Sequence, residues 1–358
     1  MRKLLIVLAA FAFVAAYTLP AMADDQWDFY GSARVLTFFT TESKEASGLG
    51  VEDEDFTHDL SGSARTVGAK VKAGDIGGRL ELGGTINLRL AYGTWNFGAG
   101  TLVVGHDYGP VNFFPSGMVY GDNSMVSYGA PYGGRHPQVK LKWAGLQVAL
   151  VQPNVVSGVA GVTETDTSMP KIEAAYSLKA GPASLYFFGG VNSHDDVVIA
   201  GTTETATSID SSVLGVGFKI PFGALYVNGD VYMATNPANY GLATTASTNK
   251  GAVPNAAGTG VEDCDSLTYA VIVGFKISPM LKIEGGYGFS SGETEVGGVT
   301  SEDEKTFMYV QLPITVAKNV TLTPEFGTVD YGDLDVTGAA SVEQGDMSYW
   351  GLRWKIDF

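Results

Sequence analysis

The sequence predicts an all-β protein, a 16-stranded antiparallel up-and-down transmembrane β-barrel. Three observations support this. Alternate residues are apolar along most of the chain, which is the period of a strand with one apolar face. Short turns rich in Gly, Pro or Asn alternate with longer polar loops, as in a barrel whose two rims differ. Beyond residue 23, no apolar run approaches the roughly 20 residues that a membrane helix needs.

The N-terminal segment has the features of a secretory signal peptide. Two basic residues precede an apolar run over residues 4–16, and Pro20 and small residues follow. Such a run is too short to span a membrane. A buried N-terminal helix is the alternative. We expect residues 1–23 to be a signal peptide and residues 24–358 to form one outer-membrane β-barrel.

Composition excludes some classes of function. The formal net charge is −16, and removing the basic leader makes it more negative. This balance argues against a nucleic-acid partner, which would require a basic face. The single cysteine, Cys264, lies in an acidic region and permits no intrachain disulfide. We expect no specific role for this thiol.

The last strand, residues 347–358, shows the alternation most clearly. Trp350, Trp354 and Phe358 lie on one face, together with other apolar residues. Aromatic residues near both ends of a strand suit the two membrane interfaces. Taken alone, this segment also fits the edge strand of a soluble sandwich. A sandwich would need a second apolar set for its partner sheet, and the chain lacks one.

The same pattern, taken in chain order, predicts sixteen strands. They cover residues 27–39, 63–73, 78–83, 86–92, 101–105, 138–143, 146–152, 171–179, 183–192, 212–220, 224–232, 267–277, 281–289, 306–316, 320–327 and 347–358. Tight turns lie on one rim and mostly long loops on the other, including an acidic loop over residues 42–62. Both termini then lie on the tight-turn rim, and the first strand pairs with the last.

Strand parity assigns charged residues to the lumen. A charge that faces lipid at mid-depth costs roughly 2–4 kcal/mol, so the polar face of each strand must point inward. The inward set holds more basic than acidic residues, with Arg34, Arg79 and Arg89 among them, and this predicts a basic lumen. Several aromatic residues share the inward parity, including Trp95.

The chain resembles the 16-stranded general porins of Gram-negative outer membranes. The resemblance rests on FYGSARV at residues 29–35, VGHDYGP at residues 104–110 and the terminal WKIDF. It implies a homotrimer and a C-terminal strand read by the barrel-assembly machinery through Trp350, Trp354 and Phe358. It also implies that the third loop, residues 106–136, folds into the barrel and narrows it.

In that family, acids on the third loop face a basic cluster on the wall, so a transverse field crosses the pore. The resemblance implies loop acids at Asp107 and Asp122. It implies a basic wall at Arg34, Arg65, Arg89 and His106. His106 stands where the family usually has arginine, and it is charged only at lower pH. Arg65 shares the parity of apolar neighbours, so it faces inward only if a bulge intervenes.

These features favour an outer-membrane channel for passive diffusion of small hydrophilic solutes and ions, with no cofactor. A substrate-selective channel for oligosaccharides or organic anions is the alternative. A barrel enzyme is remote, because no histidine has an evident Ser-His-acid spacing. The run His194, Asp195 and Asp196 contains possible metal ligands, but the ordinary polarity of a loop explains it better. Acidic loops predict contact with lipopolysaccharide through divalent cations.

Overall fold

The structure is a computed structural model that describes residues 26–358 except 61–65, 84–86, 160 and 201–202. The predicted signal peptide, residues 1–23, and Arg65 lie outside the described residues. No helix among the described residues is long and apolar enough to cross a membrane.

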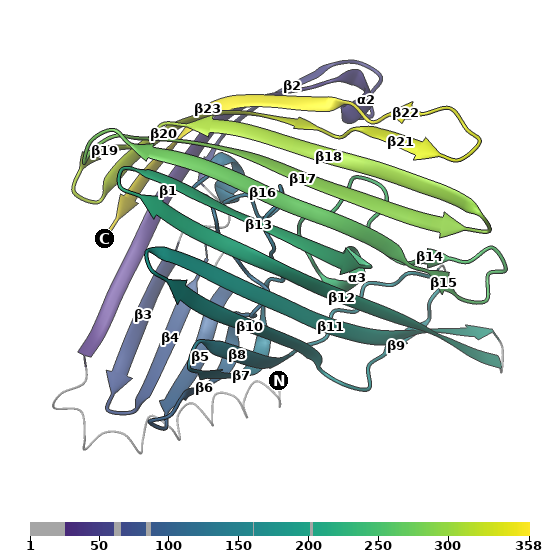
Figure 1. Cartoon of the computed structure of the whole chain (residues 1–358), viewed down its shortest axis with the longest axis horizontal. Helices are drawn as coiled ribbons and strands as arrows, with labels where there is room; N and C mark the ends of the chain where they lie inside the picture. Colours follow the sequence, from purple (N-terminus) through teal and green to yellow (C-terminus); the bar gives the residue numbers. More distant parts are fainter. Residues whose placement is uncertain (1–25, 61–65, 84–86, 160, 201–202) are drawn as a thin grey trace.

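The described chain is almost entirely β-structure (Figure 1). The strands are β1 (Gln26–Glu42), β2 (Asp53–Leu60), β3 (Thr66–Ala73), β4 (Ile76–Leu82), β5 (Leu88–Asn96), β6 (Thr101–Tyr108), β7 (Arg135–Trp143), β8 (Leu146–Val151), β9 (Glu164–Asp166), β10 (Lys171–Ala180), β11 (Ala183–Ala200), β12 (Thr203–Phe222), β13 (Leu225–Thr235), β14 (Val253–Pro254), β15 (Val261–Glu262), β16 (Cys264–Lys276), β17 (Lys282–Val296), β18 (Val299–Gln311), β19 (Ile314–Ala317), β20 (Val320–Asp330), β21 (Asp333–Val336), β22 (Val342–Glu343) and β23 (Asp346–Asp357). Short helices are α2 (Lys44–Ser47), α3 (Pro237–Tyr240) and the 3-10 helix η1 (Tyr120–Asp122).

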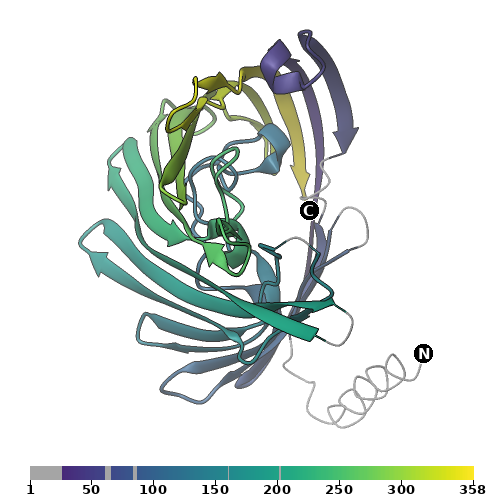
Figure 2. The ribbon, with the colours of Figure 1, turned by 90° about the vertical axis from the view of Figure 1, so that its right-hand side faces the viewer.

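The strands close into one antiparallel barrel, which confirms the predicted fold class. β2 and β3 both pair with β1 and act as one strand, as β18 and β19 do against β20. With these pairs merged, and with the short loop strands β9, β21 and β22 set apart, the described residues form sixteen barrel strands, and β1 pairs with β23 to close the seam. Figure 2 shows the wall around an interior that several connections enter. Closure pairs the first strand with the last, whose edges would otherwise be free to aggregate.

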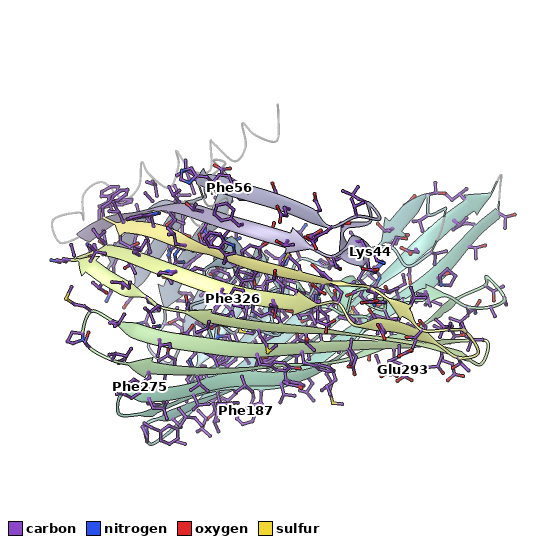
Figure 3. The ribbon with its side chains drawn as sticks, turned by 90° about the horizontal axis from the view of Figure 1, so that it is seen from above. Lys44, Phe56, Phe187, Phe275, Glu293 and Phe326 are labelled. Carbon is purple, nitrogen blue, oxygen red and sulfur yellow. The ribbon has the colours of Figure 1, made fainter. Side chains whose placement is uncertain are left out.

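The two faces of the wall differ as the alternation predicts. On β1, Leu36 and Phe38 are buried, whereas Phe29 is exposed on the outer face. On β23, Trp350 and Trp354 face outward. Phe187, Phe275 and Phe326 likewise lie on the outside of the barrel (Figure 3). An apolar outer band is the surface that lipid requires.

Some strand bounds differ from the prediction. β11 and β12 pair as far as Ala200 and Thr203, and β17 and β18 pair as far as Val296 and Val299, where long loops were predicted. The acidic segment 42–62 contains α2 and β2. The ends of β12, β17 and β18 carry polar residues on both faces, whereas β11 ends in the apolar run 197–200, which does not alternate. Paired strands that extend into water need no apolar face, so hydrophobic alternation does not reveal them.

A register shift corrects the predicted parity in β5. The shift lies between Glu81 and Leu82, where β4 pairs with β5. One extra residue moves the following side chains to the other face. Leu90 is therefore buried in the interior, and Trp95 is 51% exposed on the outer face, opposite to the inward position predicted for it.

Candidate pore

Loop 3, residues 109–134, is bonded to inward-facing carboxylates of three distant strands. Val119 N and Tyr120 N donate to Glu325 of β20 at 2.7 and 2.9 Å. Gly117 N donates to Glu284 of β17 at 2.8 Å. Val111 N donates to Glu173 of β10 at 3.0 Å. Carboxylates accept backbone N–H groups strongly, so these bonds hold loop 3 within the barrel interior.

Apolar contacts fasten the middle of loop 3. Met118, Val119 and Met125 are fully buried. They pack in one cluster with inward side chains of the wall, including Phe38 and Tyr349. The ring of Tyr120 stacks on that of Tyr349 with centroids 3.9 Å apart. Burying such side chains contributes about 1.5–3 kcal/mol each, which favours one fixed position of the loop.

Asp122 of loop 3 faces two arginines of the wall. Its Oδ1 accepts hydrogen bonds from Arg353 Nη1 at 2.6 Å and Arg34 Nη1 at 3.4 Å. The Asp122 side chain is 1% exposed. The structure thus brings together the predicted residues Asp122 and Arg34. The prediction omitted Arg353, whose inward parity was evident but whose height relative to the loop was not.

A second carboxylate organises arginines on β4 and β5. Glu81 accepts hydrogen bonds from Arg79 Nη2 at 2.6 Å, Arg89 Nε at 2.8 Å and Tyr30 OH at 2.6 Å. Arg89 also donates to the hydroxyl of Tyr108 at 3.2 Å. Arg89 therefore pairs with a wall carboxylate that the sequence prediction did not assign to the site.

The structure places both Asp107 and His106 on β6. Asp107 belongs to β6, and its Oδ2 accepts a hydrogen bond from the buried Lys140 Nζ at 2.6 Å. Asp107 is therefore a wall residue paired with Lys140, and it is not an acid of loop 3. His106 pairs in register with Ala91 and Pro137. That register places it on the face of β6 opposite to Asp107, because successive residues of a strand alternate.

Between loop 3 and the arginines lies a cavity of about 490 Å³. Three guanidinium groups and one carboxylate contribute to its lining, from Arg34, Arg89, Arg135 and Asp122. Aromatic side chains also line it, from Tyr108, Phe114 and Tyr132. The prediction missed Arg135, whose guanidinium lies over the Tyr108 ring at 5.4 Å. Its position directly after loop 3 was the available signal.

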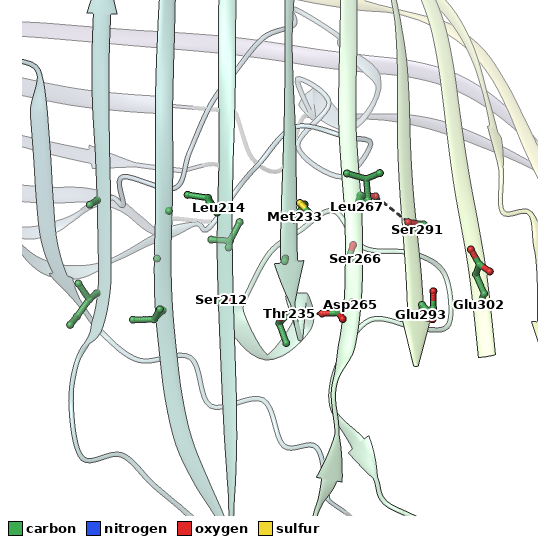
Figure 4. A pocket seen from close by; sticks show the side chains of 17 residues that line it. Ser212, Leu214, Met233, Thr235, Asp265, Ser266, Leu267, Ser291, Glu293 and Glu302 are labelled. Carbon is green, nitrogen blue, oxygen red and sulfur yellow. Dashed lines mark hydrogen bonds between the residues drawn. The ribbon is translucent and has the colours of Figure 1, made fainter. Parts of the chain in front are cut away.

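A larger concavity, of about 740 Å³, lies on the outer face of the wall over β10–β18 (Figure 4). Its lining includes Leu214, Met233 and Leu267, which face outward, and Asp265 and Glu293 lie in the adjoining row. It marks the change from the apolar band to the acidic extracellular wall, and it is not part of the lumen.

No family model matches the chain, and no curated protein matches it. Among solved structures, the outer membrane channel DcaP of Acinetobacter baumannii is similar, with a TM-score of 0.68 and 17% identity over 94% of this chain and 98% of that chain. This likeness decides the architecture. The chain has the porin fold.

Two further structures share this fold. OmpT of Vibrio cholerae in a trimer form has a TM-score of 0.60 and 17% identity, over 93% of this chain and 99% of that chain. An anion-selective porin from Comamonas acidovorans has a TM-score of 0.56 and 10% identity, over 94% of this chain and 100% of that chain. At these identities the likeness shows the porin fold alone.

Proposed function

We propose that this barrel is an outer-membrane porin, a water-filled channel for passive diffusion of small hydrophilic solutes and ions, constricted by loop 3. The cavity between Asp122 and the facing arginines carries the proposal, because it places a polar, charged space between loop and wall. Opposed charges across a narrow section orient dipolar solutes and disfavour apolar ones.

The charges around the cavity favour anions. Five arginines, Arg34, Arg79, Arg89, Arg135 and Arg353, lie on or beside it, whereas Asp122 and Glu81 supply the bonded carboxylates. The resulting positive potential attracts anions within about 8–10 Å at physiological salt. Acidic loops at the extracellular mouth oppose this effect, but they are hydrated and screened.

The reversal potential in a planar bilayer under a salt gradient tests this proposal. We expect stepwise conductance with a mild anion preference, and a weaker preference in Arg34→Ala. Cation preference would mean that the acidic loops dominate. Absence of any conductance would refute the channel and return a barrel enzyme to consideration.

A substrate-selective channel for organic anions is the second candidate. The observation that favours it is the aromatic lining beside the arginines, from Tyr108, Phe114 and Tyr132. Rings packed near guanidinium groups suit a solute with a charged end and an apolar body. Concentration-dependent block of chloride current by benzoate in the same bilayer experiment would favour selectivity over simple diffusion.

The partners follow from the same assignment. A leader at residues 1–23 would direct export across the inner membrane, and the outward Trp350, Trp354 and Phe358 would be read by the barrel-assembly machinery. A homotrimer is proposed by analogy with the trimer form of OmpT. Outward acids at the extracellular rim would contact lipopolysaccharide through divalent cations.

A further inference from the structure

A second connection also lies inside the barrel. Loop 6, residues 236–263, joins β13 to β16 and contains α3. In its first part Tyr240, Leu242 and Ala246 are 0–6% exposed. Figure 2 shows this green segment within the ring of strands, beside loop 3. A segment so buried is part of the interior, not a loop lying over the mouth.

The first anchor of loop 6, at Tyr240, lies on β10. Lys171 Nζ donates to Tyr240 O at 3.3 Å, and Tyr240 OH donates to Glu173 Oε1 at 3.1 Å. The side chains of Lys171 and Glu173 are fully buried. Glu173 also accepts the Val111 N–H of loop 3. Glu173 of the wall therefore holds both loops. Removing one partner of a buried ion pair such as Lys171–Glu173 strongly destabilises a protein.

A second anchor of loop 6, at residues 248–249, lies on β18, with five barrel strands between the two anchors. Thr248 N and Asn249 N donate to Asp303 at 2.6 and 2.9 Å. Asn249 Nδ2 donates to Ser301 Oγ at 3.1 Å. Because its anchors lie so far apart around the wall, loop 6 crosses the interior in front of the intervening strands.

The middle of loop 6 is bonded to loop 3. Thr244 Oγ1 lies 2.9 Å from Val126 O and 3.2 Å from Ala130 O, and it accepts from Gly129 N at 3.3 Å. Ala243 N donates to Tyr132 O at 3.2 Å. Loop 3 and loop 6 are therefore joined into one layer across the lumen. The arginines of β1, β5 and β23 lie on the side of this layer away from β10–β18.

We propose that loop 6 is a second pore-narrowing element, which closes the half of the lumen next to β10–β18 and confines solutes to the arginine-lined half. This inference rests on the proposed channel function. Residues 236–252 carry a single charged residue, Lys250. This part of loop 6 thus adds almost no charge to the lumen. Solutes are directed past Arg34 and Arg89, which keep partial exposure. Loop 6 would therefore set both the size limit and the selectivity.

The test replaces residues 242–249 with a short Gly-Ser linker in the full chain. Single-channel conductance and reversal potential are measured with chloride and potassium as the probes. We expect conductance to rise by about 1.5-fold or more, because the passage widens. We expect anion preference to fall as well, because the new route lacks arginines.

A milder variant keeps the test decisive if the deletion does not fold. Thr244→Val preserves side-chain shape but removes the hydroxyl that bonds loop 3. We expect larger open-channel current fluctuations than in Thr259→Val, a matched change at an exposed position of the same loop.

The proposal fails if a folded deletion variant leaves conductance and selectivity unchanged. It also fails if Thr244→Val and Thr259→Val give equal fluctuations. Absence of conductance in the unaltered chain is a different outcome, because that result refutes the channel itself.

Discussion

At the scale of single residues, Asp122 is the group on which we expect the selectivity of the proposed channel to depend. One buried oxygen is shared by two guanidinium groups, from Arg34 and Arg353. Charge-assisted bonds of this type are about twice as strong as neutral ones. Asp122 therefore compensates charge that would otherwise act on ions in the proposed channel, and it also holds loop 3 against the β1–β23 seam.

We predict that Asp122→Asn increases anion preference. The amide keeps the shape of the carboxylate but leaves the two arginines uncompensated. The ratio of chloride to potassium permeability should rise by about 2–5-fold. This corresponds to roughly 0.5–1 kcal/mol for one charge in a water-filled passage. Reversal potentials measure it, and Asp333→Asn, at an exposed position outside the pore, is the control. An equal shift in both variants would assign the effect to net charge alone.

Period-2 alternation was sufficient to place Arg34 and Arg353 on the inner face, but it could not pair them with Asp122. Parity determines which face a side chain occupies, whereas its partner depends on the height at which loop 3 crosses the barrel. Arg353 and Asp122 are 231 positions apart, and no local pattern links them. Asp107 was misassigned for a related reason, because β6 continues to Tyr108.

At the scale of elements, wall carboxylates hold the loops by accepting backbone N–H groups. Glu325 and Glu284 do so for loop 3, and Asp303 does so for loop 6. Backbone groups inside a barrel need partners, and these acids supply them where no strand is available. Sequence patterns showed the inward acids but not this use, because a loop that enters the barrel has no periodicity of its own.

We predict that Glu325→Gln loosens loop 3. The neutral amide loses the charge-assisted bonds to Val119 N and Tyr120 N, at a cost of about 1.5–3 kcal/mol for a bond to a charged group. The channel should show more frequent brief closures, measured in single-channel records. Glu343→Gln, at an exposed position of β22, should leave the records unchanged. Unaltered records in both variants would mean that the apolar contacts of Met118 and Met125 suffice.

At the scale of the whole molecule, the closed wall was predictable because lipid imposes the same alternation on every strand that it contacts. The prediction weakened where that constraint ends, in the hairpins above the membrane and in the bulge at Glu81. At the closing seam, backbone hydrogen bonds at the C-terminal residue add to the strand pairing. Phe358 N donates to Gly31 O at 3.0 Å, Gly31 N donates to Phe358 O at 2.6 Å, and the Phe358 ring lies against Gly31.

We predict that Phe358→Ala impairs assembly more than it impairs the finished barrel. The backbone bonds to Gly31 survive the substitution, so the heat-induced shift of the folded protein on a denaturing gel should change little. The yield of folded barrel in the outer membrane should fall severalfold, because the terminal ring is proposed to be recognised during insertion. Phe326→Ala removes an outward aromatic of the adjacent β20 and is the matched control. Equal losses in the two variants would reduce Phe358 to one more residue of the apolar band, whereas a loss confined to Phe358→Ala would separate the assembly signal from lipid contact.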